Sequence, residues 1–159
     1  MNRRWFLGLL PALLLADLAG ICSPANPNFT GTWKQSNERS VPARTGNVVL
    51  QIDHHDPDMT VETTILRGSA APRHAMQRYT TDGKTSTSTG ADGDEFHTSV
   101  VWNGPTLVFS VEEHEDGLVI LSRETWTLIE SGAALERRRQ RNGAAREQTV
   151  IYLRDTPEP

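Results

Sequence analysis

Apolar and polar residues alternate along most of this chain between residues 29 and 154. In segments 48–52 and 107–111, for example, every second residue is a large apolar one. A period of two places these side chains on one side of an extended strand, and it predicts a strand with one buried face. No helical period is sustained over ten residues, so the predicted fold class is all-β.

Turn-forming residues divide the pattern into about ten short strands. Asp-Gly, Asn-Gly and Asp-Pro pairs lie between successive segments, and they favour tight hairpins. The expected strands are residues 29–35, 48–54, 59–66, 75–81, 85–89, 96–102, 106–113, 118–129, 134–141 and 147–154. Consecutive hairpins predict an up-and-down antiparallel β-barrel of about 8–10 strands, closed so that no edge stays unpaired. Residues 36–47, which contain Pro42 and Gly46, are expected to form a loop with little helix.

The first 25 residues depart from this pattern and are typical of an export signal that is cleaved. Arg3 and Arg4 precede an apolar run over residues 5–15, which is shorter than the ~20 residues of a membrane-spanning helix. The paired arginines suit either the Sec or the twin-arginine route, and both stay open. We therefore expect a signal peptide over 1–25 and a barrel domain over 26–156, in a bacterial periplasm or secreted.

The single cysteine lies within this segment. We expect cleavage after Ala25, with Ser23 at the −3 position, and cleavage after Gly20 or Cys22 is an alternative. Ile21 disfavours a lipid anchor, because a small residue normally precedes a lipidated cysteine. A chain cut after Ala25 has no thiol, which excludes disulfides, a thiol nucleophile and a cysteine zinc site.

Charge narrows the range of partners. The chain has 159 residues and a net charge of −4. Residues 1–25 contribute two arginines and one aspartate, a net of +1, so the remainder carries −5. An acidic body suits neither nucleic acid nor an anionic membrane surface. We expect no nucleic-acid partner and no stable membrane insertion once the signal is removed.

The most specific motif opens the first expected strand: Phe29-Thr30-Gly31-Thr32-Trp33-Lys34. It resembles the opening strand of the calycin superfamily, which covers lipocalins and fatty-acid-binding proteins, and in particular small secreted bacterial lipocalin-like proteins. The resemblance implies that Trp33 closes the barrel floor and that an arginine of the last strand, here Arg154, packs over its ring. Gly31 has no Cβ, which would let another backbone approach closely.

The resemblance also bears on ligand binding. In fatty-acid-binding proteins an Arg-x-Tyr pair on the last strand holds the ligand carboxylate. Tyr152 matches the tyrosine here, but Val150 stands at the arginine position. Binding of a carboxylate would then pass to another arginine, and the preceding strand offers four within residues 137–141.

These arginines alternate between the two faces of their strand, so at least one enters the barrel. A luminal guanidinium cannot be discharged, so it must be solvated, ion-paired or bound to an anion. One hypothesis is an internal pair with Glu62, Glu124 or Glu136, or a position near the open rim of the barrel where water solvates the arginine. The other is an anchor for an anionic head group, for which we favour Arg138 or Arg139 with Tyr152. Phe109 and Trp126 complete the candidate ligand-binding residues, although core packing alone explains both.

The histidines do not predict a metal site. His54 and His55 are adjacent on a strand and therefore point to opposite faces. His114 lies in an acidic hairpin tip that suits solvation, whereas His74 and His97 are isolated in sequence. We expect neither a metal nor another cofactor.

The preferred hypothesis is an exported barrel that sequesters or carries a small, mostly apolar or amphipathic molecule, with an anionic head group as a refinement. An alternative is an accessory subunit of an envelope complex, with a lumen filled by side chains and a protein partner. No Ser-His-Asp order with an elbow glycine and no glycine-rich phosphate loop occurs. A calycin-type isomerase or cyclase is therefore the third hypothesis.

Overall fold

The computed structural model describes residues 25–90 and 93–156, and it is an all-β structure of ten antiparallel strands. The expected signal peptide lies, apart from Ala25, outside these residues. The strands are β1 Gly31–Val41, β2 Asn47–His55, β3 Asp58–Leu66, β4 Arg73–Thr80, β5 Asp82–Thr89, β6 Glu95–Asn103, β7 Thr106–Glu115, β8 Leu118–Ile129, β9 Ala134–Arg141 and β10 Gln148–Arg154. The predicted fold class and the predicted number of strands are both confirmed.

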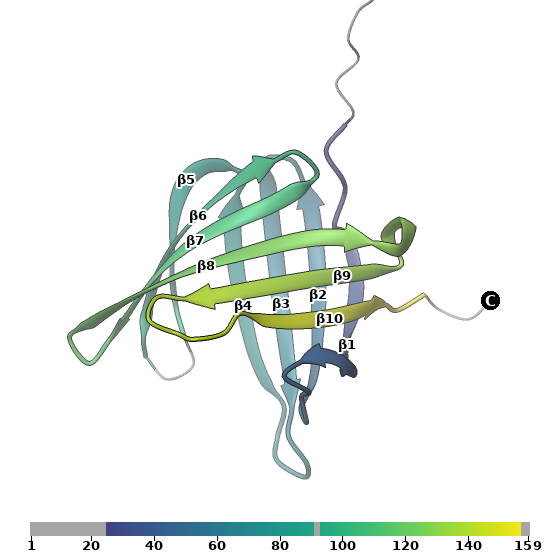
Figure 1. The fold of residues 1–159 in the computed structure, drawn as a ribbon, viewed down its shortest axis with the longest axis horizontal. Helices are drawn as coiled ribbons and strands as arrows, with labels where there is room; N and C mark the ends of the chain where they lie inside the picture. Colours follow the sequence, from purple (N-terminus) through teal and green to yellow (C-terminus); the bar gives the residue numbers. More distant parts are fainter. Residues whose placement is uncertain (1–24, 91–92, 157–159) are drawn as a thin grey trace, which may run out of the picture.

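Each strand pairs with its neighbours in sequence, except that β4 and β5 share no ladder and that β1 also pairs with β10. Trp33 faces Arg154 across this junction, which joins the two ends of the meander. Figure 1 shows the result as two layers, in which β2, β3 and β4 stand behind β7–β10 and cross them steeply. The interior between these layers holds the candidate site.

Closure is incomplete, which corrects the expectation that no edge stays unpaired. Within the described residues β4 and β5 lie at the two ends of the sheet order and share no ladder. Thr81 lies between them and turns toward another hairpin: its N–H donates to Pro57 O at 2.8 Å, and its hydroxyl donates to Asp56. These bonds anchor the connection on the β2–β3 turn, so β5 does not fold back along β4.

The first strand is longer than its sequence suggested. Residues 36–47 were expected to form a loop, but β1 continues to Val41 and leaves only residues 42–46 as a non-helical connection. The β1–β10 register shifts after Ser36, and the Ser40 hydroxyl bridges the shift. It accepts from Ile151 N–H at 3.2 Å and donates to Ser36 O at 2.6 Å. A side chain thus replaces a ladder bond, which strand periodicity cannot reveal.

Two-residue turns fix the register of the hairpins that carry the site. Asp116 and Gly117 both have positive φ, as a tight hairpin between right-handed twisted strands requires, and they place Glu115 opposite Leu118. The β6–β7 turn at residues 104–105 places Asn103 opposite Thr106. The 3₁₀ turn Glu130–Gly132 is the only helical element that the described part of the chain contains. No helix there is long and apolar enough to cross a membrane.

The core occupies the end of the barrel where the chain enters β1. Phe29, Trp33, Leu50, Leu107 and Leu135 are fully inaccessible to solvent. They belong to strands or segments from both layers and meet between them. This end of the lumen is therefore filled by side chains, and any cavity must lie toward the opposite end.

Candidate functional site

The barrel floor is built on Trp33. The guanidinium of Arg154 lies over its ring, with Cζ 4.1 Å from the ring centroid. The Trp33 Nε1–H donates to Phe29 O at 3.0 Å, and Arg154 donates to Thr30 O at 2.8 Å and to Gly132 O at 2.9 Å. The structure thus places Trp33 and Arg154 together at the closed end.

Gly31 belongs to the same contact, but not for the expected reason. The three atoms nearest to a Cβ at this position all belong to side chains, and Arg154 Nη1 would lie only 2.6 Å from it. Gly31 also has a φ of +146°, which L side chains rarely adopt. The missing side chain makes room for the cation rather than for a neighbouring strand.

A second polar group closes the floor beside Phe29. His54 points inward and contacts the rings of Phe29 and Trp102, and its Nδ1 accepts from Phe29 N–H at 3.3 Å. The pKa of His54 is lowered, because burial disfavours the imidazolium more than nearby Asp56 favours it. Asp56 accepts from Trp102 Nε1–H at 2.9 Å. The neighbouring His55 points outward to Asp53 Oδ1 at 3.1 Å, so the two histidines occupy opposite faces.

A buried ion pair lies above the floor. Glu124 Oε1 accepts from Trp126 Nε1 at 2.5 Å and from Arg137 Nε and Nη2, each at 2.6 Å. The Arg137 guanidinium lies 4.4 Å from the Trp126 ring centroid and 5.6 Å from that of Tyr152. The Glu124 charge, the Tyr152 oxygen and the hydrogen bond from Arg137 to Glu124 raise the pKa of Arg137 despite its burial. Arg137, which the sequence hypothesis did not select, is therefore the luminal arginine with an internal partner.

The expected aromatic ligand contacts lie in the core. Phe109 and Trp126 are almost fully buried and stack with centroids 4.7 Å apart, and Tyr79 packs edge-on against Phe109 at 5.5 Å. Burial and the Glu124 charge raise the pKa of the Tyr79 hydroxyl. Neither Phe109 nor Trp126 lines the cavities described next, because the Arg137–Glu124 layer lies between.

A cavity of about 240 Å³ opens above this layer. Its apolar wall comes from Val48, Val150 and Tyr152. Its polar wall is formed by Gln35, Arg44, Glu124, Arg137, Arg139 and Gln148. Arg44 comes from the 42–46 connection, and its Nη2 donates to Gln148 Oε1 at 2.8 Å. The Arg44 Nε is buried without a hydrogen-bond partner among the described residues.

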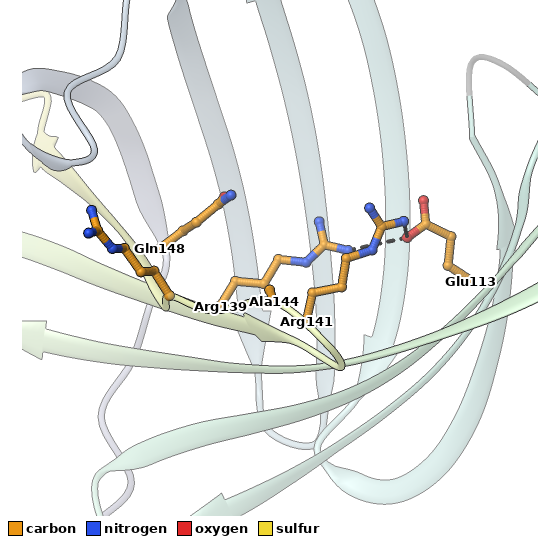
Figure 2. A pocket seen from close by; sticks show the side chains of 6 residues that line it. Glu113, Arg139, Arg141, Ala144 and Gln148 are labelled. Atoms are coloured by element: carbon orange, nitrogen blue, oxygen red, sulfur yellow. Dashed lines mark hydrogen bonds and ion pairs between the residues drawn. The ribbon is translucent and has the colours of Figure 1, made fainter.

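An outer cavity of about 320 Å³ shares Arg139 and Gln148 with the first one and forms the barrel mouth. Figure 2 shows Arg139 and Arg141 extending from β9 toward a single carboxylate, that of Glu113 on β7. The two N–O distances are 3.4 and 3.3 Å, longer than those of the deeper pair. Arg141 also approaches Glu115 at 3.7 Å. The mouth thus holds cations that share their acidic partners.

Arg138 is not part of this site, which corrects the expectation that named it with Arg139. Leu135 and Arg137 face inward, so the period of two places Arg139 inward and Arg138 outward. Arg138 is exposed and pairs with Glu136 at 2.8 Å. Arginines lie on both faces of β9, so the sequence did not show which face is luminal. The burial of Leu135 determines it, because residues at even spacing from Leu135 face the lumen.

Positive charge therefore predominates in the lumen. The residues that line the two cavities include two glutamates and five arginines, an excess of three positive charges; the arginines are Arg44, Arg137, Arg139, Arg141 and Arg146. Sequence analysis missed Arg137, Glu113 and Arg44 as lining residues. Arg137 lies two residues after the apolar Leu135 and therefore on the same face of β9, which could have identified it. Glu113 and Arg44 reach the cavities from other parts of the barrel, and local sequence patterns do not encode those distances.

His97 is not isolated once the strands are paired, which corrects the sequence interpretation. It lies on the outer face of β6, with its ring centroid 4.9 Å from that of His114 on β7. The β6–β7 turn sets this pairing. Counting outward from the Asn103–Thr106 pair would have predicted His97 opposite Glu112.

Comparison with solved structures confirms the fold. The chain is similar to a protein described as the REP1-NXSQ fatty acid transporter, with 14% identity, 81% of this chain and 97% of that chain covered, and a TM-score of 0.60. It is also similar to a Schistosoma mansoni fatty acid binding protein in complex with arachidonic acid, with 12% identity, 80% and 96% coverage, and a TM-score of 0.56. A secretory abundant heat soluble protein of Ramazzottius varieornatus gives 10% identity, 79% and 94% coverage, and a TM-score of 0.61.

No protein-family model and no curated protein sequence matches the chain. At identities of 10–14%, the structural similarity establishes the fold alone. The fold is the up-and-down antiparallel β-barrel that these solved structures share and that the strand pattern predicted.

Proposed function

We propose that this chain is an exported barrel that binds a small amphipathic molecule in its lumen and holds the anionic head group of that molecule with Arg139 and Arg141. The single observation that carries the proposal is the luminal excess of three positive charges in a chain whose net charge is −4. Guanidinium groups bind carboxylates and phosphates with paired, charge-assisted hydrogen bonds.

The two mouth arginines are the best anchors because their internal partner is shared. Glu124 neutralises Arg137 at 2.6 Å, whereas Glu113 divides one carboxylate between Arg139 and Arg141 at 3.3–3.4 Å. A ligand anion would give Arg139 a second acceptor, and it would give Arg141 an acceptor closer than Glu115 at 3.7 Å. Arg44, whose Nε lacks a described partner, lies on the same cavity.

The apolar part of the ligand must be short. The cavity above the Arg137–Glu124 layer measures about 240 Å³, and Val48, Val150 and Tyr152 form its apolar wall. The similarity to proteins described as a fatty acid transporter and a fatty acid binding protein supports an apolar or amphipathic ligand class. We therefore propose a medium-chain carboxylate, such as octanoate, or a molecule of similar size and polarity.

Export is the second element of the proposal. Arg3, Arg4 and the apolar run over residues 5–15 support it, and residues 26–156 would form the mature barrel. Fractionation of cells that express the full chain tests this element. A shortened protein in the periplasm or medium supports export, whereas a full-length protein in the cytoplasm refutes it.

Titration with octanoate, followed by calorimetry, tests the ligand class. We expect octanoate to bind and octan-1-ol, which lacks the charge, to bind at least about tenfold more weakly. Arg139→Gln should weaken octanoate binding by about tenfold, and Arg141→Gln should have a similar effect.

Arg138→Gln is the matched control, because it removes the same charge from the outer face of the same strand. Its affinity for octanoate should equal that of the parent. Equal weakening by Arg138→Gln and Arg139→Gln, or equal affinity for octanoate and octan-1-ol, would refute the proposed anchor.

An accessory subunit of an envelope complex is the second candidate function. It is favoured by the filled lower lumen and by the exposed apolar side chains of Val101, Val119 and Leu121. Native mass spectrometry of protein purified from its own cells distinguishes the two candidates. An added mass of a few hundred daltons supports a ligand barrel, and co-purification of a stoichiometric protein supports the second candidate.

A further inference from the structure

We propose that the outer wall of the barrel carries a binding site for a divalent transition-metal ion, with Zn²⁺ as the reference ion, formed by His97, Glu112 and His114. The site lies on β6 and β7, on the face opposite the luminal arginines. It is independent of the ligand proposed above, since none of its three residues lines the two luminal cavities.

The pairing of β6 and β7 brings the ligands together. His97 faces Glu112 across the ladder, and His114 faces Glu95. On the outer face, β6 therefore carries a glutamate followed by a histidine, and β7 does the same, so that each histidine lies opposite a glutamate of the other strand. The two imidazole rings lie 4.9 Å apart, and the candidate ligand atoms of His97, Glu112 and His114 all lie within 4.8 Å of one another.

Each imidazole already contacts a carboxylate oxygen. His97 Nε2 lies 2.5 Å from Glu95 Oε1, and His114 Nε2 lies 2.8 Å from Glu112 Oε1. Metal binding would replace the proton between His114 and Glu112 with the cation, and the imidazole of His97 would turn from Glu95 toward that cation. Ligand atoms around tetrahedral zinc are about 3.3 Å apart, so the widest separation must close by about 1.5 Å. Both imidazoles are roughly one-third exposed, at 36% and 37%, which leaves them room to rotate.

The donor set selects the class of metal. Two imidazoles and a carboxylate suit Zn²⁺ and its neighbours in the first transition row, whereas Mg²⁺ and Ca²⁺ prefer oxygen ligands throughout. A surface hollow of about 470 Å³ borders His97 and Glu112, so solvent can supply a fourth ligand. No other described histidine belongs to such a group: His54 is buried beside Asp56, His55 lies beside Asp53, and His74 contacts Thr64.

Glu113 gives the site a structural consequence. It lies between Glu112 and His114 in β7 and points to the opposite face, where Arg139 and Arg141 share its carboxylate. A metal ion on the outer face would fix the strand segment that carries Glu113. The segment 112–114 thus carries two ligands of the metal site on its outer face and the shared carboxylate of the mouth on its inner face.

Isothermal titration of the full chain with ZnCl₂ tests the proposal. The protein is prepared without a histidine tag and dialysed against a chelator and then against metal-free buffer. We expect one equivalent of Zn²⁺ to bind. His97→Gln and His114→Gln should each weaken binding by about tenfold or more. His55→Gln, which removes a histidine beside a carboxylate but outside the site, should leave the affinity unchanged.

Cobalt spectroscopy separates metal ligation from a change in folding. Co²⁺ should give the parent chain and His55→Gln a visible absorption band of histidine-ligated cobalt, and this band should be absent from both site variants. Circular dichroism establishes that each variant is folded. Failure of the parent to bind Zn²⁺ saturably, parent-like binding by both site variants, or equal loss in His55→Gln would each overturn the assignment.

Discussion

The buried pair of Glu124 and Arg137 provides the sharpest energetic prediction. Glu124→Gln keeps the size of the side chain and one acceptor oxygen, but it removes the charge that faces Arg137. That guanidinium is only 25% exposed and lies against Trp126, so water can reach it only from the cavity and replaces the carboxylate incompletely. We therefore expect the variant to be strongly destabilised rather than merely rearranged.

The magnitude follows from the geometry. Three nitrogen donors lie within 2.6 Å of Glu124 Oε1, and Glu124 itself is 11% exposed. Unit charges about 4 Å apart attract by about 4 kcal/mol at an effective dielectric constant of about 20. Removing one partner of a buried pair costs about 3–5 kcal/mol. Partial exposure of Arg137 places the expected loss of unfolding free energy at the lower end, about 3 kcal/mol.

Urea unfolding followed by far-ultraviolet circular dichroism measures this loss. Glu136→Gln is the matched control, because its partner Arg138 is exposed, and it should cost about 0.5 kcal/mol. The double variant Glu124→Met/Arg137→Met removes both charges and should recover to within about 1–2 kcal/mol of the parent. A loss below about 1 kcal/mol for Glu124→Gln, or a double variant as unstable as the sum of its singles, would refute the reasoning.

Three further outcomes follow from the fold. Gly31→Ala should lower the free energy of unfolding by about 1–3 kcal/mol, because it adds a methyl group against Arg154 at a φ of +146°. A urea midpoint equal to that of the unsubstituted protein would contradict this prediction. Ser40→Ala should cost about 1–2 kcal/mol because it leaves Ile151 N–H unpaired, whereas Ser36→Ala keeps the carbonyl that Ser40 uses and should cost less. Because the pKa of His54 is lowered in the folded state, its contribution to the free energy of unfolding is fully present above the unfolded pKa of about 6.5 and declines below that pH. Urea unfolding at pH 7.5 and at pH 5.5 should therefore show a lower free energy of unfolding at pH 5.5, and His54→Asn should make this difference smaller.

The sequence predicted the elements of this fold well because local chemistry determines them. The alternation of apolar and polar residues predicted the ten strands, and turn residues such as Asp116-Gly117 predicted where the chain reverses direction. The sequence-based prediction was wrong where a side-chain hydrogen bond replaces a backbone one or anchors a connection between strands. Ser40 extends β1 through a hydroxyl bridge, and Thr81 anchors the β4–β5 connection elsewhere. Neither bond leaves a signal in the hydrophobic pattern.

The candidate site was predictable only in part. The sequence indicated that an arginine of residues 134–141 enters the lumen, and Arg137 and Arg139 do. It could not choose the phase, because both faces of β9 carry arginine, and so it favoured Arg138 as well. Glu113 and His97 acquire their partners only through the register of neighbouring strands. The sequence shows which residue types are present, but the hairpin registers determine which of them lie side by side.

The missing ladder between β4 and β5 has a consequence for self-association. Each of these strands exposes a row of unsatisfied amide and carbonyl groups to which a second polypeptide could add. Arg73 and Arg78 on β4 are exposed, whereas Lys84 on β5 is paired with Asp82. Two copies that approached each other along β4 would bring like charges together, and this repulsion disfavours pairing of β4 with its copy in a second molecule.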